Sequence, residues 1–112
     1  MSNLYLKENP TLKDIQEYVY KLKIERGFNT TDKVYESLLL AEEVGELIKA
    51  VRKNLKDAFV DITANPKAED VKEEIADVLI FLLSIANMHN IDVEEAFRQK
   101  EEKNKTRVWK KN

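Results

Sequence analysis

Residues 74–83 of this 112-residue chain read EIADVLIFLL, in which two acidic residues lead into an apolar run. Glu74 and Asp77 are three positions apart, so on a helix both side chains project from one face. The rest of the segment is apolar on nearly every side, which is typical of a helix buried on more than one side. The two acids are in line with one apolar stripe of this helix, formed by Phe81, Ile85 and Met88. We therefore expect the two carboxylates to face protein rather than bulk water.

A second acidic pair lies in residues 40–47, which read LAEEVGEL. Glu43 and Glu46 are again three residues apart on a predicted helix, and Glu43 borders an apolar stripe. Buried charge that is not compensated is costly, so buried carboxylates are paired or bind a metal. Four convergent carboxylates also repel one another unless a cation lies between them. Because oxygen ligands suit hard cations, the two pairs predict a Mg²⁺ site, with Mn²⁺ or Ca²⁺ as substitutes.

A surface arrangement is the alternative interpretation of the same acids. Charged residues make up 36% of the chain, so one pair with this spacing arises easily by chance. The acids would then pair with lysines of the same helices, Lys49, Lys53 and Lys72. Two acidic pairs on two adjoining apolar helices favour the metal site.

The composition is that of a single domain, residues 1–112, built from long helices. The apolar fraction is 43%, and two glycines and two prolines are too few for a turn-rich β fold. There is no cysteine, which excludes disulfides, thiolate zinc sites and a cysteine nucleophile. A net charge of −2 gives no general attraction to nucleic acid or to anionic membranes.

The sequence predicts neither export nor membrane insertion. Its first residues lack the basic-then-apolar layout of a signal peptide. The longest fully apolar run, residues 78–83, is far too short to span a bilayer. Together with the absence of cysteine, these features predict a cytoplasmic protein.

Start and stop signals predict four helices, arranged as an all-α four-helix bundle. Thr11 with Asp14 resembles a capping box, and a glycine at position 27 ends the first helix at about residue 26. The second helix should span about residues 32–54, and the third should begin at about residue 66 or 69 and end near 89. Asp92, with an acid three residues on, should start the fourth helix. Residues 56–68 are predicted as a loop or a short helical turn.

Apolar residues cover more helix surface than one small bundle can bury. A stripe on the second helix should face the core, and it consists of Leu40, Val44, Leu47, Ile48, Val51 and Leu55. Because the third helix is apolar on two sides, we expect one side to pack against another subunit in a homo-oligomer. Gly45 costs roughly 1 kcal/mol relative to alanine inside a helix, which predicts a close approach by a helix or ligand.

Two further segments carry candidate binding residues. Phe28 lies in the connection after the first helix, either packed on the core or as a platform for a base. Lys100, Asn104 and Arg107 continue an apolar stripe of the fourth helix, either as a solvated helix end or as a phosphate-binding face. Trp109 either packs on a neighbour or borders a pocket.

Several other active-site chemistries are excluded. A di-iron bundle needs Glu-x-x-His pairs, but the only histidine is His89 and residue 86 is alanine. There is no glycine-rich phosphate loop, and neither Ser37 nor Ser84 has an evident base partner. The class of chemistry that these exclusions leave is a metal-assisted reaction on a phosphorylated substrate.

Three motifs, taken in order, resemble the MazG-like all-α nucleoside triphosphate pyrophosphohydrolases, particularly the single-domain members of the dCTPase and dUTPase-like superfamily. They are LAEEVGEL at residues 40–47, EEIADVLI at residues 73–80 and KxxKNxxR at residues 100–107. Each motif alone is weak, but the ordered set is more specific and extends over nearly the whole chain. Residues 56–66 match no motif of that family and would help to shape the substrate pocket.

The resemblance implies roles for both groups of candidate residues. The catalytic Mg²⁺ ligands would be the four acids, Glu43, Glu46, Glu74 and Asp77. Substrate contacts would come from Lys100, Asn104 and Arg107 to the phosphates, and from Phe28 and Trp109 to the base. Members of the family convert a nucleoside triphosphate to its monophosphate and pyrophosphate. They are homodimers or homotetramers with sites near subunit interfaces.

The function that this resemblance implies is Mg²⁺-dependent hydrolysis of non-standard or surplus nucleotides. One alternative is the phosphoribosyl-ATP pyrophosphohydrolase of histidine biosynthesis, which has a related bundle and acidic motifs. Another is a catalytically silent nucleotide-binding oligomerisation module. Release of pyrophosphate from ordinary deoxynucleotides would separate the hydrolase of surplus nucleotides from the phosphoribosyl-ATP enzyme.

Overall fold

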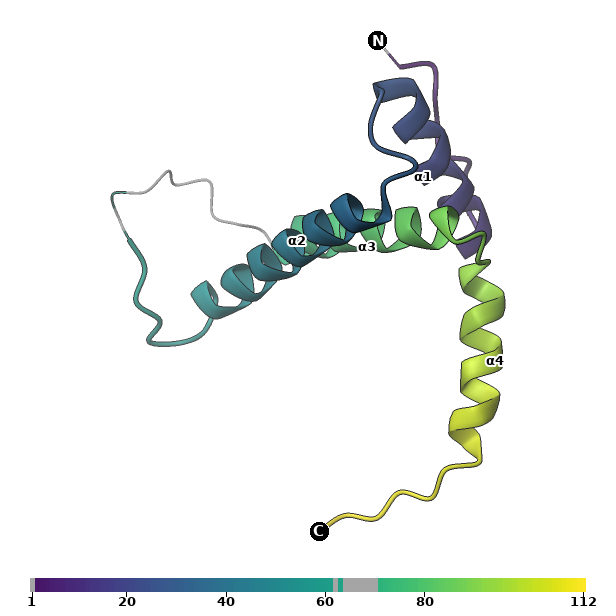
Figure 1. Cartoon of the computed structure of the whole chain (residues 1–112). Coiled ribbons are helices and arrows are strands. Elements are labelled where there is room, and N and C mark those ends of the chain that lie inside the picture. Colours follow the sequence, from purple (N-terminus) through teal and green to yellow (C-terminus); the bar gives the residue numbers. More distant parts are fainter. Residues whose placement is uncertain (1, 62, 64–70) are drawn as a thin grey trace.

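In a computed structural model that describes residues 2–61, 63 and 71–112, the chain is all-α (Figure 1). Its helices are α1 (Leu12–Arg26), α2 (Lys33–Lys53), α3 (Val71–Met88) and α4 (Val93–Lys105), and the described residues include no strand. The predicted all-α fold with four helices is therefore confirmed. The predicted start of the third helix at residue 66 or 69 lies outside the described residues. In the loop before it, residues 56–61 and 63 are not helical.

Both ends of α1 and the starts of α2 and α4 lie at the predicted local signals. The hydroxyl of Thr11 accepts the Asp14 N–H at 3.1 Å, and the Asp14 carboxylate accepts the Thr11 N–H at 2.9 Å, which completes a capping box. Asp32 and Asp92 cap α2 and α4 with their carboxylates, which accept the backbone N–H of Tyr35 and of Glu95, respectively. Gly27 ends α1 with a φ of 69°, a left-handed conformation that suits glycine. This sharp stop places Phe28 at the turn that leads into α2.

The α2 and α3 helices lie side by side and run in opposite directions, and α1 packs against α3 (Figure 1). Among the described residues, the buried apolar side chains belong to these three helices: Val19, Leu22, Ala50, Leu83 and Ala86. The α4 helix packs against α1 and projects away from the α2–α3 pair. The contact between α2 and α3 is thus the part of the fold that can position a site.

A buried glutamine joins α1 to the corner between α3 and α4. The side-chain amide of Gln16 donates to Asn87 Oδ1 at 2.9 Å and to the Ile91 carbonyl at 2.6 Å. Its oxygen accepts the backbone N–H of Val93, the first residue of α4, at 3.0 Å. Because these partners satisfy both ends of the buried amide, the corner has a defined geometry. It directs α4 away from the other helices.

A large apolar surface of α2 and α3 is exposed in the single chain. It comprises Val44, Ile48, Val51 and Leu55 from α2 and the residues just after it, with Ile75, Leu79 and Leu82 from α3. The expectation that the whole α2 stripe faces the core of its own chain is therefore wrong at these positions. The radius of gyration is 17.5 Å, whereas a compact domain of this length has about 13 Å. The helices of one chain are therefore too far spread to bury these apolar residues.

The close approach expected at Gly45 is not made within the described residues. A Cβ atom built at this position would meet no atom within 4 Å apart from its chain neighbours and the backbone of its own helix.

The described helices include none that is singly long and apolar enough to cross a membrane. Only α3 and α4 together satisfy that test, across a bend of 93°.

Candidate metal and nucleotide site

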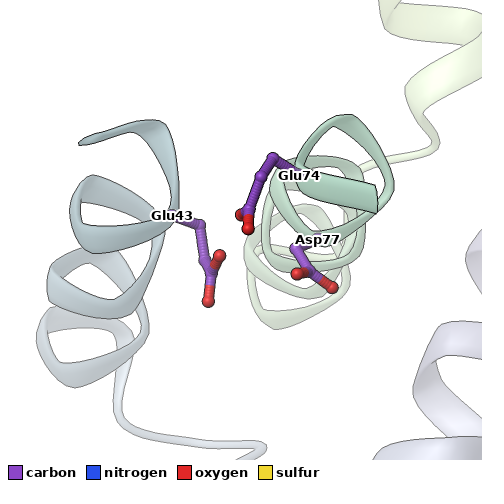
Figure 2. Close-up of side chains that lie close together, drawn as sticks. All are labelled: Glu43, Glu74 and Asp77. Carbon is purple, nitrogen blue, oxygen red and sulfur yellow. The ribbon is translucent and has the colours of Figure 1, made fainter. Parts of the chain in front are cut away.

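Three of the four predicted acidic ligands converge between α2 and α3. Figure 2 shows Glu43 of α2 facing Glu74 and Asp77 of α3, with the three carboxylates close to one another. One oxygen from each carboxylate lies within 4.8 Å of the others, and all three residues are half-buried. The three-residue spacing on α3 puts two acids on the same face, and the opposed direction of α2 brings the third to them. This is an all-oxygen donor set of the kind that hard divalent cations prefer.

The electrostatics of this cluster suit a cation. Burial, the negative charge of Asp77 and a side-chain hydrogen bond with Glu74 raise the pKa of Glu43 to about 7. One oxygen of Glu74, Oε2, is buried and has no hydrogen-bond partner among the described residues. A divalent ion would offset the repulsion and bind the unpartnered oxygen. The geometry of these three carboxylates is therefore suited to binding a metal ion.

Glu46, the fourth predicted ligand, lies one turn further along α2 from Glu43. It is half-buried, but its carboxylate is not among those that converge within 4.8 Å. The sequence spacing predicts the helix face of Glu46 correctly, since Glu43 and Glu46 are neighbours on that face. It does not determine how far each side chain reaches towards α3.

A cavity of about 600 Å³ extends from the acidic cluster to the turn between α1 and α2. Glu43 and Asp77 line it together with Phe28 and Tyr35, and its size is within the range of small-molecule sites. Phe28 is 56% exposed, so it is not an aromatic packed into the core. Of the two interpretations of Phe28, the structure favours a platform beside a pocket.

The sequence matches the model of the MazG nucleotide pyrophosphohydrolase domain over residues 30–110. The chain belongs to this family. Among solved structures it is similar to YPJD from Bacillus subtilis, a protein provisionally assigned as a pyrophosphatase. The two are 31% identical, the match covers 91% of this chain and 100% of that one, and the TM-score is 0.71. No curated protein matches the sequence.

The predicted phosphate-binding residues of this MazG chain are not brought to the acids within one chain. Lys100 and Arg107 are exposed, while Asn104 is half-buried with its side-chain oxygen unpartnered among the described residues. Trp109 is 77% exposed in the C-terminal tail. None of these four residues lines the cavity that contains Glu43. The α4 helix projects away from α2 and α3 (Figure 1).

Sequence reasoning missed a buried polar group in this MazG domain. Lys23, Glu36 and Ser84 are 4%, 1% and 2% exposed, respectively. The Lys23 ammonium donates to Ser84 Oγ at 2.7 Å and forms an ion pair with Glu36 Oε2. The Ser84 hydroxyl donates to the same Glu36 oxygen. Burial lowers the pKa of Lys23.

A signal for this group is present in the sequence. Glu36 is seven residues before Glu43, and Ser84 is seven residues after Asp77. Seven residues are almost two helical turns, so each lies on the same face as an acid of the cluster. Because polar residues that continue a core-facing stripe are unusual, the helical spacing could have identified both positions.

Proposed function

We propose that this MazG-family chain is a Mg²⁺-dependent nucleotide pyrophosphohydrolase that converts a (deoxy)nucleoside triphosphate and water to the monophosphate and pyrophosphate. In this reaction the oxygen of water bonds to the α-phosphorus, and the bond from that phosphorus to the bridging oxygen of pyrophosphate breaks. Non-standard or surplus nucleotides are the proposed substrates. The absence of cysteine fits a cytoplasmic setting.

The observation that carries the proposal is the position of the acidic cluster on the wall of the cavity. Glu43 and Asp77 line the same cavity as Phe28, an exposed aromatic that can stack on a base. A triphosphate near the acids would thus have its base in reach of the aromatic. A plain structural bundle has no need for either feature.

The chain's own residues have separate roles in this proposal. Glu43, Glu74 and Asp77 would hold Mg²⁺, with Glu46 as a further carboxylate on the same face of α2. Mn²⁺ would substitute, because it accepts the same oxygen ligands. When bound, such an ion polarises phosphate oxygens and lowers the pKa of water. Phe28 would orient the base relative to the reacting phosphate.

Lys100, Asn104 and Arg107 would bind the phosphates from a second copy of the chain. Cations that contact a triphosphate offset its charge and that of the transition state. In one chain α4 does not reach the acids, so a partner's α4 is the proposed source of these side chains. Trp109, which follows on the same tail, would contact the base in the same way.

The exposed apolar surface of α2 and α3 supports a homodimer or a homotetramer. Exposed apolar residues that share one helix face, as these do on α2 and on α3, mark interaction sites. Ile48, Leu55 and Ile75 are each more than half exposed, which is costly for a chain in water. A second copy that packs on this surface would bury these residues.

The test is release of pyrophosphate from a panel of standard and modified nucleoside triphosphates, with Mg²⁺ and with EDTA. We expect Mg²⁺-dependent release by the wild type that is lost in Asp77→Asn and kept in Glu25→Gln, a matched exposed acid of α1 that is outside the cavity. A folded protein that binds these nucleotides without turnover would instead be a binding module. Release from phosphoribosyl-ATP alone would place it in histidine biosynthesis.

A further inference from the structure

We propose that Glu36 is a specificity-determining residue that accepts a hydrogen bond from the exocyclic amino group of the substrate's base. This inference rests on the proposed function, since it concerns the base of the nucleotide that the cavity would bind. The ligand class is a nucleotide whose base carries an amino group, such as cytosine or adenine. Their keto counterparts, uracil and hypoxanthine, would bind more weakly.

Glu36 has an acceptor atom that receives no hydrogen bond from the described residues. Glu36 is 1% exposed, and its Oε1 atom has no hydrogen-bond partner among the described residues, although the residue lines the cavity. Its other oxygen, Oε2, already interacts with both Lys23 and Ser84. A buried carboxylate oxygen that lacks a donor is costly, so a ligand N–H in the cavity would relieve that cost.

The two neighbours of Glu36, Lys23 and Ser84, fix its orientation. The Lys23 ammonium forms an ion pair with Oε2 of the Glu36 carboxylate, and the Ser84 hydroxyl donates a hydrogen bond to the same oxygen. Both contacts engage Oε2, which leaves Oε1 as an acceptor of hydrogen bonds. An ionised carboxylate accepts hydrogen bonds but cannot donate one. It therefore favours a base with an amino group over a base with a keto oxygen at the same ring position.

Glu36 lies about two helical turns from the acidic cluster. Glu36 precedes Glu43 by seven residues on α2, and Ser84 follows Asp77 by seven residues on α3. At 1.5 Å per residue this is roughly 10 Å along the helices. Because α2 and α3 run in opposite directions, both displacements point the same way (Figure 1). A nucleotide with its phosphates at the acids would extend its base towards Glu36.

A purely structural ion pair is the competing explanation of Lys23 and Glu36. A structural pair buried in the fold would satisfy both carboxylate oxygens and would not need to border a cavity. Here the cavity is lined by Lys23 and Glu36 themselves, by Phe28 and Asn29 at the turn, and by Tyr35 in the first turn of α2. The aromatic residues supply stacking, and the carboxylate supplies the polar contact that selects the base.

The test measures binding of monophosphates, so that it does not depend on turnover. Dissociation constants are compared by calorimetry within two pairs, dCMP with dUMP and dAMP with dIMP, whose members differ by an amino or a keto group. A hydrogen bond to a charged group typically gives about tenfold in affinity or more. We expect at least that preference for the amino member of one pair. A smaller ratio in both pairs overturns the proposal.

Variants then assign the preference to Glu36. In Glu36→Gln we expect the amino-to-keto ratio to fall towards one, because an amide can donate to a keto oxygen. Since this change leaves Lys23 without its charged partner, the paired variant Lys23→Met with Glu36→Gln removes both charges together and is the version expected to fold. A merely structural role would weaken both members of a pair equally and leave the ratio unchanged. Glu25→Gln, which removes an exposed charge from α1, should leave the ratio as in the wild type.

A measurement on the wild type makes the test independent of any variant. The amino protons of bound dCMP or dAMP should give nuclear Overhauser effects to the side chain of Glu36, and their absence overturns the proposal. Failure of the proposed function is recognised separately. If the amino preference is present but no triphosphate releases pyrophosphate, the base contact stands and the hydrolysis does not.

Discussion

Glu43 on α2 and Asp77 on α3 lie close enough that the negative charge of one hinders ionisation of the other. With burial of the carboxyl group, this repulsion raises the pKa of Glu43 to about 7. In the absence of a cation, the fold therefore brings together carboxylates that destabilise it once they are ionised. This relationship links the stability of the protein to both pH and divalent metal.

Stability without metal should fall as the pH rises from about 5 to 8. The pKa of Glu43 is about 7 in the folded chain and 4.5 as an isolated group, so the folded state holds a proton that the unfolded state has lost within this range. Because the native state binds more protons, the free energy of unfolding decreases with increasing pH. Urea denaturation in EDTA at several pH values measures this slope.

The control is Glu43→Gln, which cannot ionise at position 43. Its unfolding free energy should depend less on pH over the same range, and at pH 8 it should equal or exceed that of the metal-free wild type. Mg²⁺ should stabilise the wild type at pH 8 more than it stabilises the variant. Equal slopes for the two proteins would contradict the assignment.

The helices and the shared face of the two acids on α3 could be predicted because both depend on local rules. Thr11 and Gly27 determine the ends of α1 through hydrogen bonds and backbone conformation within a few residues. Glu74 and Asp77 share a face because of helical periodicity alone. Hence the all-α fold and the shared face of the two α3 acids follow from residue spacing, whereas the approach of Glu43 depends on how α2 packs on α3.

Other features could not be predicted because they depend on how whole helices are placed. The α2 stripe reads as core-facing, but Ile48 is 62% exposed, since none of the described helices of the chain covers it. Similarly, the spacing of Lys100 and Asn104 gives their common face but not the direction in which α4 leaves α3. The pairing of Lys23 with Glu36 joins two helices and is decided by the packing of α1.

Loss of a converging carboxylate should harm activity more than loss of Glu46. Glu74→Gln and Asp77→Asn each remove a member of the cluster, while Glu46→Gln changes an acid whose oxygens lie outside it. Changes to groups that only support a metal ligand typically cost about 10–100-fold, so a ligand itself should cost at least the upper part of that range. The values of kcat/KM for pyrophosphate release, measured against Mg²⁺ concentration, give the ranking. An equal loss of kcat/KM in all three variants would show that Glu46 binds the metal as the other acids do.

Gly45→Ala should stabilise the chain. Gly45 is an exposed residue within α2, and a Cβ atom there would meet no atom within 4 Å. Alanine is favoured over glycine inside a helix by about 1 kcal/mol, partly because it restricts the unfolded chain. Urea denaturation at two protein concentrations measures the gain. A loss of stability that grows on dilution would instead mean that a second subunit packs against Gly45.

Mixing two inactive variants should restore activity if α4 serves a neighbouring subunit. Asp77→Asn removes an acid of the cluster, and Lys100→Ala removes a cation of α4 that does not line the cavity of its own chain. After the two are unfolded and refolded together, a mixed dimer would contain one site with the acids of one chain and the lysine of the other. Half of the dimers would be mixed with one intact site each, so roughly a quarter of the wild-type activity should return.

The same mixture distinguishes the two placements of Lys100. If Lys100 bound the phosphates of its own chain, every site in a mixed dimer would lack either Asp77 or Lys100, and no activity would return. A mixture of Asp77→Asn with Glu74→Gln is the matched control, because both changes affect the same cluster and no combination yields an intact site. Recovery confined to the first mixture would establish that two copies of the chain build each site.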